Sequence, residues 1–250
     1  MSDAQKKIWI TGASSGIGKA VAKKFAEKGW KIAISSRRKK TLDTIADNQN
    51  IFSFPLDVTS EENCKKVFKE IIQSFNSLDV CFFCSGTYDP NKEKQINLEQ
   101  NKFVMNVNYF GTLNCVKVVE EYFKKKRNGH ISIVSSIAGY RGLPNSSGYG
   151  PSKAALTNFA ESIYFDFKKY NVRVSVVSPG FIKTPLTDKN EFDMPFLKSP
   201  EFAANQIYKG LVNSNSFEIH FPKPLTLFLK FLRILPYRIY LILVDKLVKR

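Results

Sequence analysis

A tyrosine and a lysine stand four residues apart at Tyr149 and Lys153, just ahead of the helix-favouring residues 154–156. On a helix this spacing places both side chains on one face, one turn apart. A nearby ammonium favours the phenolate, so we expect the pKa of Tyr149 to fall from its usual value of about 10 towards neutral pH. Phenol and ammonium together form an acid–base pair suited to proton transfer at an oxygen atom.

A hydroxyl side chain is expected to reach the same space. Residues 131–134 are a short apolar run typical of a buried strand, and the run ends at Ser135 and Ser136. A bare tyrosine and lysine at this spacing more often lie on a solvated helix surface without function. The neighbouring motifs decide between these two interpretations, and they favour chemistry.

A phosphate-binding loop is predicted near the N-terminus. Residues 7–10 are an apolar strand, residues 11–18 are rich in glycine, and a helical stretch follows as far as Gly29. Glycine permits a tight turn and close approach to the backbone, while the helix N-terminus offers N–H donors to a pyrophosphate. The predicted contacts are Gly12, Ser14, Ser15, Gly16, Ile17 and Gly18.

The end of the second predicted strand, residues 31–35, indicates which dinucleotide would bind. An acidic residue at that point would hold a ribose 2′-hydroxyl, but this chain continues with Ser36, Arg37 and Arg38. Guanidinium groups suit a 2′-phosphate, so the two arginines favour NADP(H) over NAD(H). The alternative is the solvated start of a helix.

Strands and helices alternate along the rest of the chain, with no break that would indicate a second domain. This alternation predicts an α/β fold, a single doubly wound, Rossmann-type parallel sheet with helices on both faces, formed by residues 1–221. The remaining strands are predicted at 50–56, 78–84, 131–134, 172–178 and 217–221, and helices at 59–75, 97–125 and 201–211.

Composition limits the function classes. The chain has 250 residues and a formal charge of +16, but its lysines are spread throughout, and neither a zinc-ligand spacing nor an RNA-binding signature is present. We therefore predict no metal site and no nucleic-acid partner. Four cysteines are too few for a disulfide framework, and the N-terminus resembles no signal peptide, so a cytoplasmic location is expected.

Together these motifs resemble the short-chain dehydrogenase/reductase family over residues 6 to about 220. The motifs are residues 11–18, Leu-Asp-Val-Thr at 56–59, Asn108 before Gly111, Ser136, Tyr149 with Lys153, and Pro-Gly-Phe-Ile-Lys-Thr at 179–184. The resemblance implies that Tyr149 is the general acid/base and that Ser136 holds the substrate oxygen. It also implies that Lys153 lowers the tyrosine pKa and binds the nicotinamide ribose, and that Asn108 anchors a water of a proton relay.

The same resemblance supplies the remaining cofactor contacts and the reaction. Thr184 would meet the carboxamide, Asp57 and Val58 the adenine, and Gly86 the ribose, with Pro179, Gly180 and Ile182 beside them. The implied function is an NADP(H)-dependent oxidoreductase that transfers hydride between nicotinamide and a hydrophobic carbonyl or alcohol, as a homodimer or homotetramer. The alternative is a catalytically weak dinucleotide-binding regulator or a membrane-surface scaffold.

Two features depart from the common pattern. After the fourth predicted strand the family usually has Asn-Asn-Ala-Gly, whereas residues 83–86 are Phe-Cys-Ser-Gly, so the hydrogen bonds of both amides must be replaced or lost. The substrate pocket would be walled by residues 87–94, 140–147 and 186–200. The last of these segments is rich in apolar side chains, which indicates a hydrophobic substrate.

Residues 222–250 extend beyond the family core as a predicted amphipathic helical extension, with two helices separated at Pro236. A broad apolar face with a basic stripe is typical of a helix that lies in a membrane interface, and basic residues within the bilayer make spanning costly. Peripheral contact with an anionic membrane and packing over the substrate mouth or in an oligomer both remain open. The predicted polar stripe is Lys223, Thr226, Lys230, Arg233 and Tyr237.

Overall fold

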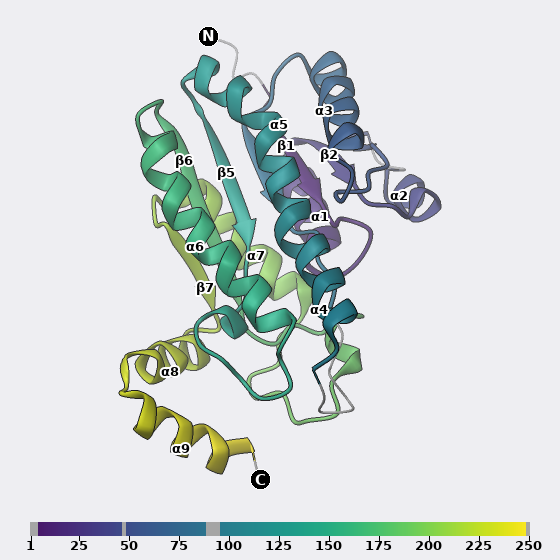
Figure 1. Cartoon of the computed structure of the whole chain (residues 1–250). Helices are drawn as coiled ribbons and strands as arrows, with labels where there is room; N and C mark the ends of the chain where they lie inside the picture. Colours follow the sequence, from purple (N-terminus) through teal and green to yellow (C-terminus); the bar gives the residue numbers. More distant parts are fainter. Residues whose placement is uncertain (1–4, 47–48, 89–95, 249–250) are drawn as a thin grey trace.

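The computed structural model describes residues 5–46, 49–88 and 96–248, which form a sheet covered by helices on both faces (Figure 1). In this described part the sheet has seven strands in the order β3-β2-β1-β4-β5-β6-β7, and every neighbouring pair is parallel. The predicted fold class is therefore confirmed. The strands are β1 Lys7–Thr11, β2 Lys31–Ser35, β3 Ile51–Ser53, β4 Val80–Phe83, β5 Gly129–Val134, β6 Val172–Pro179 and β7 Glu218–Phe221.

Two helical layers bury the sheet. Helices α1 and α7 pack on one face, and α3, α5 and α6 pack on the other. The three central residues of strand β1 are all apolar because both faces of the strand are covered: Ile8 and Ile10 contact the first layer, and Trp9 contacts the second. The helices are α1 Gly16–Glu27, α2 Lys39–Ile45, α3 Glu61–Phe75, α4 Leu98–Met105, α5 Gly111–Lys126, α6 Tyr149–Lys168 and α7 Pro200–Asn213.

The predicted long helix at 97–125 is interrupted. A π-helical turn, Asn106–Phe110, separates α4 from α5, so Asn108 lies where the regular helical hydrogen-bond ladder is broken. Single π-turns inside α-helices often mark functional sites. The third strand is also shorter than predicted, but Phe54 and Leu56 continue its direction through backbone hydrogen bonds to Ile34 and Ser36.

The C-terminal extension forms two helices, α8 Lys223–Ile234 and α9 Tyr237–Val248, which follow β7 and lie at the lower end of the molecule in Figure 1. Each has 12 residues, and among the helices in residues 5–46, 49–88 and 96–248 none is long and apolar enough to cross a bilayer. Because all strands are parallel, the loops after β1, β4, β5 and β6 meet at one edge of the sheet, where a binding crevice is expected.

Candidate active site

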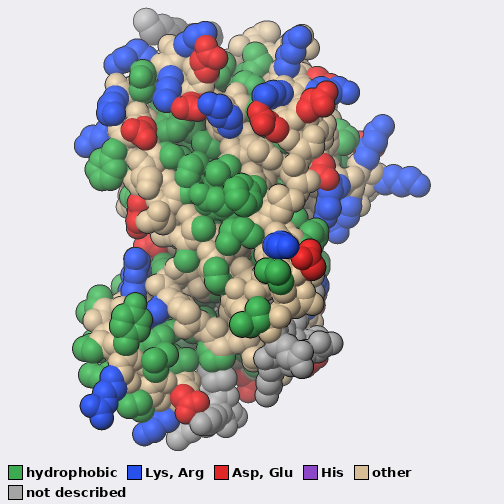
Figure 2. All heavy atoms as spheres, viewed as in Figure 1, with side chains coloured by type: hydrophobic (Ala, Val, Ile, Leu, Met, Phe, Trp, Pro, Cys, Tyr) green, Lys and Arg blue, Asp and Glu red, His purple; other side chains and the backbone are tan. Residues whose placement is uncertain are grey.

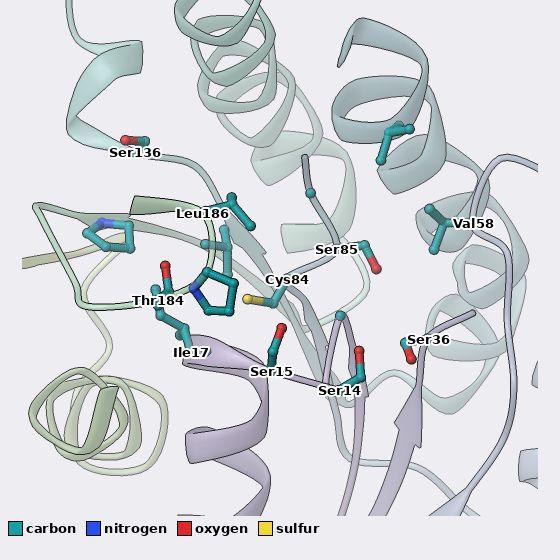
Figure 3. A pocket seen from close by; sticks show the side chains of 18 of the residues that line it. Ser14, Ser15, Ile17, Ser36, Val58, Cys84, Ser85, Ser136, Thr184 and Leu186 are labelled. Carbon is teal, nitrogen blue, oxygen red and sulfur yellow. The ribbon is translucent and has the colours of Figure 1, made fainter. Parts of the chain in front are cut away.

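A cavity of about 360 Å³ opens at this edge, between the N-terminus of α1 and the loops that follow β4, β5 and β6 (Figure 3). Every cofactor residue predicted from the sequence lines it, together with Ser136, Tyr149 and Lys153, whereas Asn108 does not. The cavity is also lined by residues that the sequence analysis did not name as catalytic or cofactor-binding, which include Ser36, Leu56, Thr59, Cys84, Ser85, Val107, Val134, Ser135, Pro185, Leu186 and Thr187.

The glycine loop packs against neighbouring backbone too closely for a side chain at two of its glycines. Gly12 has φ of +67°, and a Cβ there would lie 2.6 Å from the carbonyl oxygen of Cys84. A Cβ on Gly18 would lie 2.5 Å from the carbonyl oxygen of Gly12. Ser15, the N-cap of α1, makes no side-chain capping hydrogen bond, and the first turn of the helix lines the cavity. This arrangement fits a pyrophosphate at a helix N-terminus.

Two arginines face the same region in different ways. Arg38 lies over the glycine loop, and its guanidinium donates to the Ser14 hydroxyl at 3.0 and 2.8 Å and to the Ser15 hydroxyl at 2.7 Å. Arg37 lines the cavity beside Asp57. Burial acts to raise the pKa of Asp57, but hydrogen bonds from Thr59 and the charge of Arg37 outweigh it and hold that pKa below its usual value.

Tyr149 and Lys153 lie on the first turns of α6, but their electrostatics differ from the sequence-based expectation. Burial raises the pKa of Tyr149 to about 12, although a hydrogen bond with Ser136 opposes this shift. The expected lowering by Lys153 is wrong for this geometry, because the ammonium donates to the backbone oxygen of Val134 at 2.9 Å and lies 5.6 Å from the centre of the tyrosine ring. Burial also lowers the pKa of Lys153, to about 8.

Asn108 lies behind the cavity wall and is fully buried. Its Oδ1 accepts from the backbone N–H of Thr87 at 2.7 Å, while its Nδ2 donates to the Thr87 carbonyl and to the Ser152 hydroxyl, both at 3.0 Å. The π-turn thus ties the segment after β4 to helix α6. Sequence reasoning missed Ser152, whose only signal is its place directly before Lys153.

Thr11 at the end of β1 holds the segment in which the two asparagines of the family pattern are missing. Its hydroxyl oxygen accepts from the backbone N–H groups of Cys84 and Ser85, at 3.1 and 3.2 Å. The loop after β4 is therefore held against the glycine loop without an amide side chain. Burial raises the pKa of the Cys84 thiol to about 11, so this cysteine stays protonated at neutral pH.

Only some residues of the predicted substrate walls lie at the cavity. Leu186 lines it, and the ring of Tyr88 packs edge-on against Tyr149 with centroids 5.1 Å apart. Residues 89–94 of the first wall lie outside the described residues. Tyr140 is buried, packs against Leu225 of α8 and donates to Glu218 Oε1 of β7 at 2.6 Å, and it does not line the cavity.

Comparisons with known proteins identify the family and the fold. A family model described as short chain dehydrogenase matches residues 6–194. A protein of Myxococcus xanthus named "Uncharacterized oxidoreductase" is 30% identical over 232 residues, which cover 91% of each chain. The structure titled "ElxO with NADP Bound" is 27% identical, with a TM-score of 0.76 over 86% of this chain and 97% of that one. A short-chain dehydrogenase from Streptomyces avermitilis shares the fold, with 21% identity and a TM-score of 0.84 over 99% and 98% of the two chains.

Proposed function

This chain belongs to the short-chain dehydrogenase family, and from that premise we propose that it is an NADP(H)-dependent oxidoreductase acting on a hydrophobic carbonyl or alcohol. One observation carries the proposal. A single cavity joins the glycine loop and both arginines to Ser136, Tyr149 and Lys153. Phosphate-binding groups and an acid–base pair in one cavity are what a nicotinamide-dependent reaction at a carbon–oxygen bond requires.

The hydrogen-bond donors and cationic groups in the cavity wall suit a nicotinamide dinucleotide. Gly16 and Gly18 at the start of α1 would hold the pyrophosphate, and Arg37 with Arg38 would hold a 2′-phosphate. Asp57 and Val58 would contact the adenine, and Thr184 the carboxamide. When bound, the cofactor supplies or accepts the hydride. The NADP-bound structure of ElxO is consistent with this assignment.

Tyr149 is the proposed proton donor in the reducing direction. With a pKa of about 12, its phenol stays protonated at neutral pH and can give its proton to a carbonyl oxygen that gains negative charge. Ser136 supplies a second hydrogen bond to that oxygen, and this bond strengthens as charge develops. Lys153, whose ammonium lies 5.6 Å from the centre of the tyrosine ring, would bind the nicotinamide ribose, and in the oxidising direction the proton transfer runs in reverse.

Asn108 serves the reaction as a positioning residue in this proposal. Its three hydrogen bonds fix the backbone of Thr87 and the Ser152 hydroxyl, one residue ahead of Lys153. Assembly as a homodimer or homotetramer and the water relay at Asn108 remain predictions. A catalytically weak dinucleotide-binding regulator is the second candidate, but the joint presence of Ser136, Tyr149 and Lys153 in the cavity favours the enzyme.

A screen of NADPH oxidation over apolar ketones and aldehydes tests the proposal, with Tyr149→Phe as the decisive variant. Loss of the phenol should lower the turnover number by about 10²–10⁴-fold and leave NADPH affinity within about twofold of wild type. Tyr164→Phe, on the same helix and outside the cavity lining, is the matched control and should keep wild-type turnover. Retention of more than about a tenth of the rate by Tyr149→Phe would remove Tyr149 from the chemistry.

A further inference from the structure

Helix α8 turns Thr226 and Lys230 towards the catalytic domain, whereas Lys223 and Arg233 on the same helix are exposed. Lys230 forms an ion pair with Glu218, and the Thr226 hydroxyl is buried against His220 Nδ1 at 2.7 Å. Both residues belong to the polar stripe predicted from the sequence, and in the structure this part of the stripe packs inward. Its partners lie on β7, the strand that directly precedes the helix.

The extension is held as a structured part of the molecule. The Nη1 atom of Arg141 donates to the carbonyl oxygens of Leu232, Arg233 and Leu235, at 2.9, 3.1 and 2.7 Å, where α8 ends. A cation suits this end of a helix. The same guanidinium lies 4.0 Å from the ring centre of Tyr240, whose hydroxyl donates to the Gly142 carbonyl at 2.5 Å.

The surface left outside is apolar. Phe228, Phe231 and Ile234 on α8 are 48%, 56% and 77% exposed, whereas the outer side of an ordinary surface helix is polar. Figure 2 shows hydrophobic side chains gathered over this lower lobe, with basic side chains at its margin. We call this surface the tail face; its apolar members are Leu227, Phe228, Phe231, Ile234, Ile239, Leu241 and Ile242.

The charges around the tail face are nearly all positive. Its exposed basic residues are Lys223, Arg233, Arg238 and Lys246, and Asp245 is the only acidic residue in the sequence from 222 to 250. A second copy of this chain would bring equal positive charges together across a symmetric contact, which is unfavourable. The chain as a whole carries a formal charge of +16. An apolar surface with a cationic margin is instead complementary to anionic lipid head groups above an acyl layer.

We propose that the tail face docks on the surface of an anionic bilayer, with α8 and α9 lying in the interface. The apolar side chains enter the boundary between head groups and acyl chains, and the four basic residues contact the head groups. The packing of α8 on Arg141 and Glu218 and the docking of its outer side do not compete, because they use opposite sides of the helix.

Vesicle flotation of the full chain tests the apolar part of the proposal. The wild type should float with phosphatidylcholine vesicles that contain phosphatidylserine, and much less with phosphatidylcholine alone. The double variant Phe228→Glu/Phe231→Glu should stay in the soluble fraction. Phe165→Glu, at a residue that is 67% exposed on α6, is the matched control and should float like the wild type.

Charge reversal tests the electrostatic part. Arg233→Glu/Arg238→Glu should lower the partition coefficient on phosphatidylserine vesicles at least about tenfold, because each basic residue near an anionic surface contributes measurably to binding. Lys66→Glu/Lys69→Glu on α3 changes the net charge equally, away from the tail face, and should have a much smaller effect. High salt should weaken wild-type binding in the same way.

Thermal melting of each variant separates loss of binding from loss of fold. Failure of the wild type to float with anionic vesicles would overturn the proposal, as would equal losses in the variants and their controls. A different outcome would assign the tail face to a second copy of this chain. In that case the wild type does not bind vesicles, and Phe228→Glu/Phe231→Glu lowers the mass measured by analytical ultracentrifugation. Each of these readouts is independent of catalysis, so the proposed reaction can fail without affecting the result.

Discussion

The catalytic cavity and the C-terminal helices lie on either side of one short segment, residues 136–142, and each contains a lysine that is held in a different way. Lys153 is 4% exposed and donates to a backbone carbonyl, that of Val134. Lys230 forms an ion pair with Glu218, which also accepts from Tyr140. A cation matched by a carboxylate holds elements together, whereas one held only by a carbonyl keeps its charge available to a ligand and shifts its pKa.

Removal of each lysine tests this comparison, and the larger effect is expected on catalysis. Lys153→Ala should lower kcat/KM at least about a hundredfold and raise the KM for the cofactor, since the positive charge beside the phenol is lost. Its melting temperature should change little, because burial of this charge is unfavourable in the folded state. Steady-state kinetics and thermal melting on the same preparations measure both quantities.

Lys230→Ala should give the opposite pattern. It leaves the half-buried Glu218 carboxylate without its cation, at a cost of about 1–3 kcal/mol in the free energy of unfolding, while kcat/KM for a small soluble carbonyl stays near wild type. If both lysine variants lose activity and stability in parallel, the functional and structural cations are not distinct.

A variant at Arg141 tests how the C-terminal helices are held to the rest of the protein. Arg141→Ala removes a charged donor from three carbonyls and should lower the free energy of unfolding by about 1.5–3 kcal/mol. The rate of amide hydrogen exchange should increase more in α8 and α9 than in the sheet. Arg127→Ala is the matched control, because Arg127 is exposed and donates to a single carbonyl at 3.3 Å. Equal destabilisation by both variants would mean that the three hydrogen bonds from Arg141 to the end of α8 make no special contribution to stability.

The pH dependence of carbonyl reduction gives a graded effect, small near neutral pH. Lys153 has a pKa of about 8, so its charge is lost above that pH, whereas Tyr149, with a pKa of about 12, remains protonated. We expect kcat/KM to be flat below pH 8 and then to fall about tenfold per pH unit, the slope of one ionisation. Lys153→Arg should remove this alkaline limb if it is active, since arginine keeps its charge. A limb that persists unchanged in Lys153→Arg would assign it to another group.

The predictability of these regions from sequence differs for a physical reason. Residues of the cavity come from short motifs in which type and spacing reflect local geometry, so Gly12, Ser136 and Thr184 are found at the cavity as predicted. The buried place of Asn108 depends on a π-turn, which changes the direction of a side chain without a clear sequence signal. Contacts between segments far apart in the sequence likewise have no local sequence signal.

The two arginines and the Tyr149 pKa illustrate the same point. The sequence indicates both Arg37 and Arg38 for the 2′-phosphate, and both line the cavity, but only the structure shows that Arg38 contacts the glycine-loop serines. The expected fall of the Tyr149 pKa assumes that Lys153 acts through space alone. Burial, which depends on the whole surrounding fold, is the larger effect and has the opposite sign.

Isothermal titration calorimetry of NADPH and NADH with the wild-type protein tests the central claim that this cavity is an NADP(H) site. NADPH should bind at least about tenfold more tightly than NADH, since charged hydrogen bonds to a 2′-phosphate contribute about 1.5–3 kcal/mol. Arg37→Ala and Arg38→Ala should each reduce this preference by weakening NADPH binding while NADH affinity stays nearly constant. Equal affinity for both dinucleotides would contradict the NADP(H) assignment, and binding of neither would contradict the proposed function as a whole.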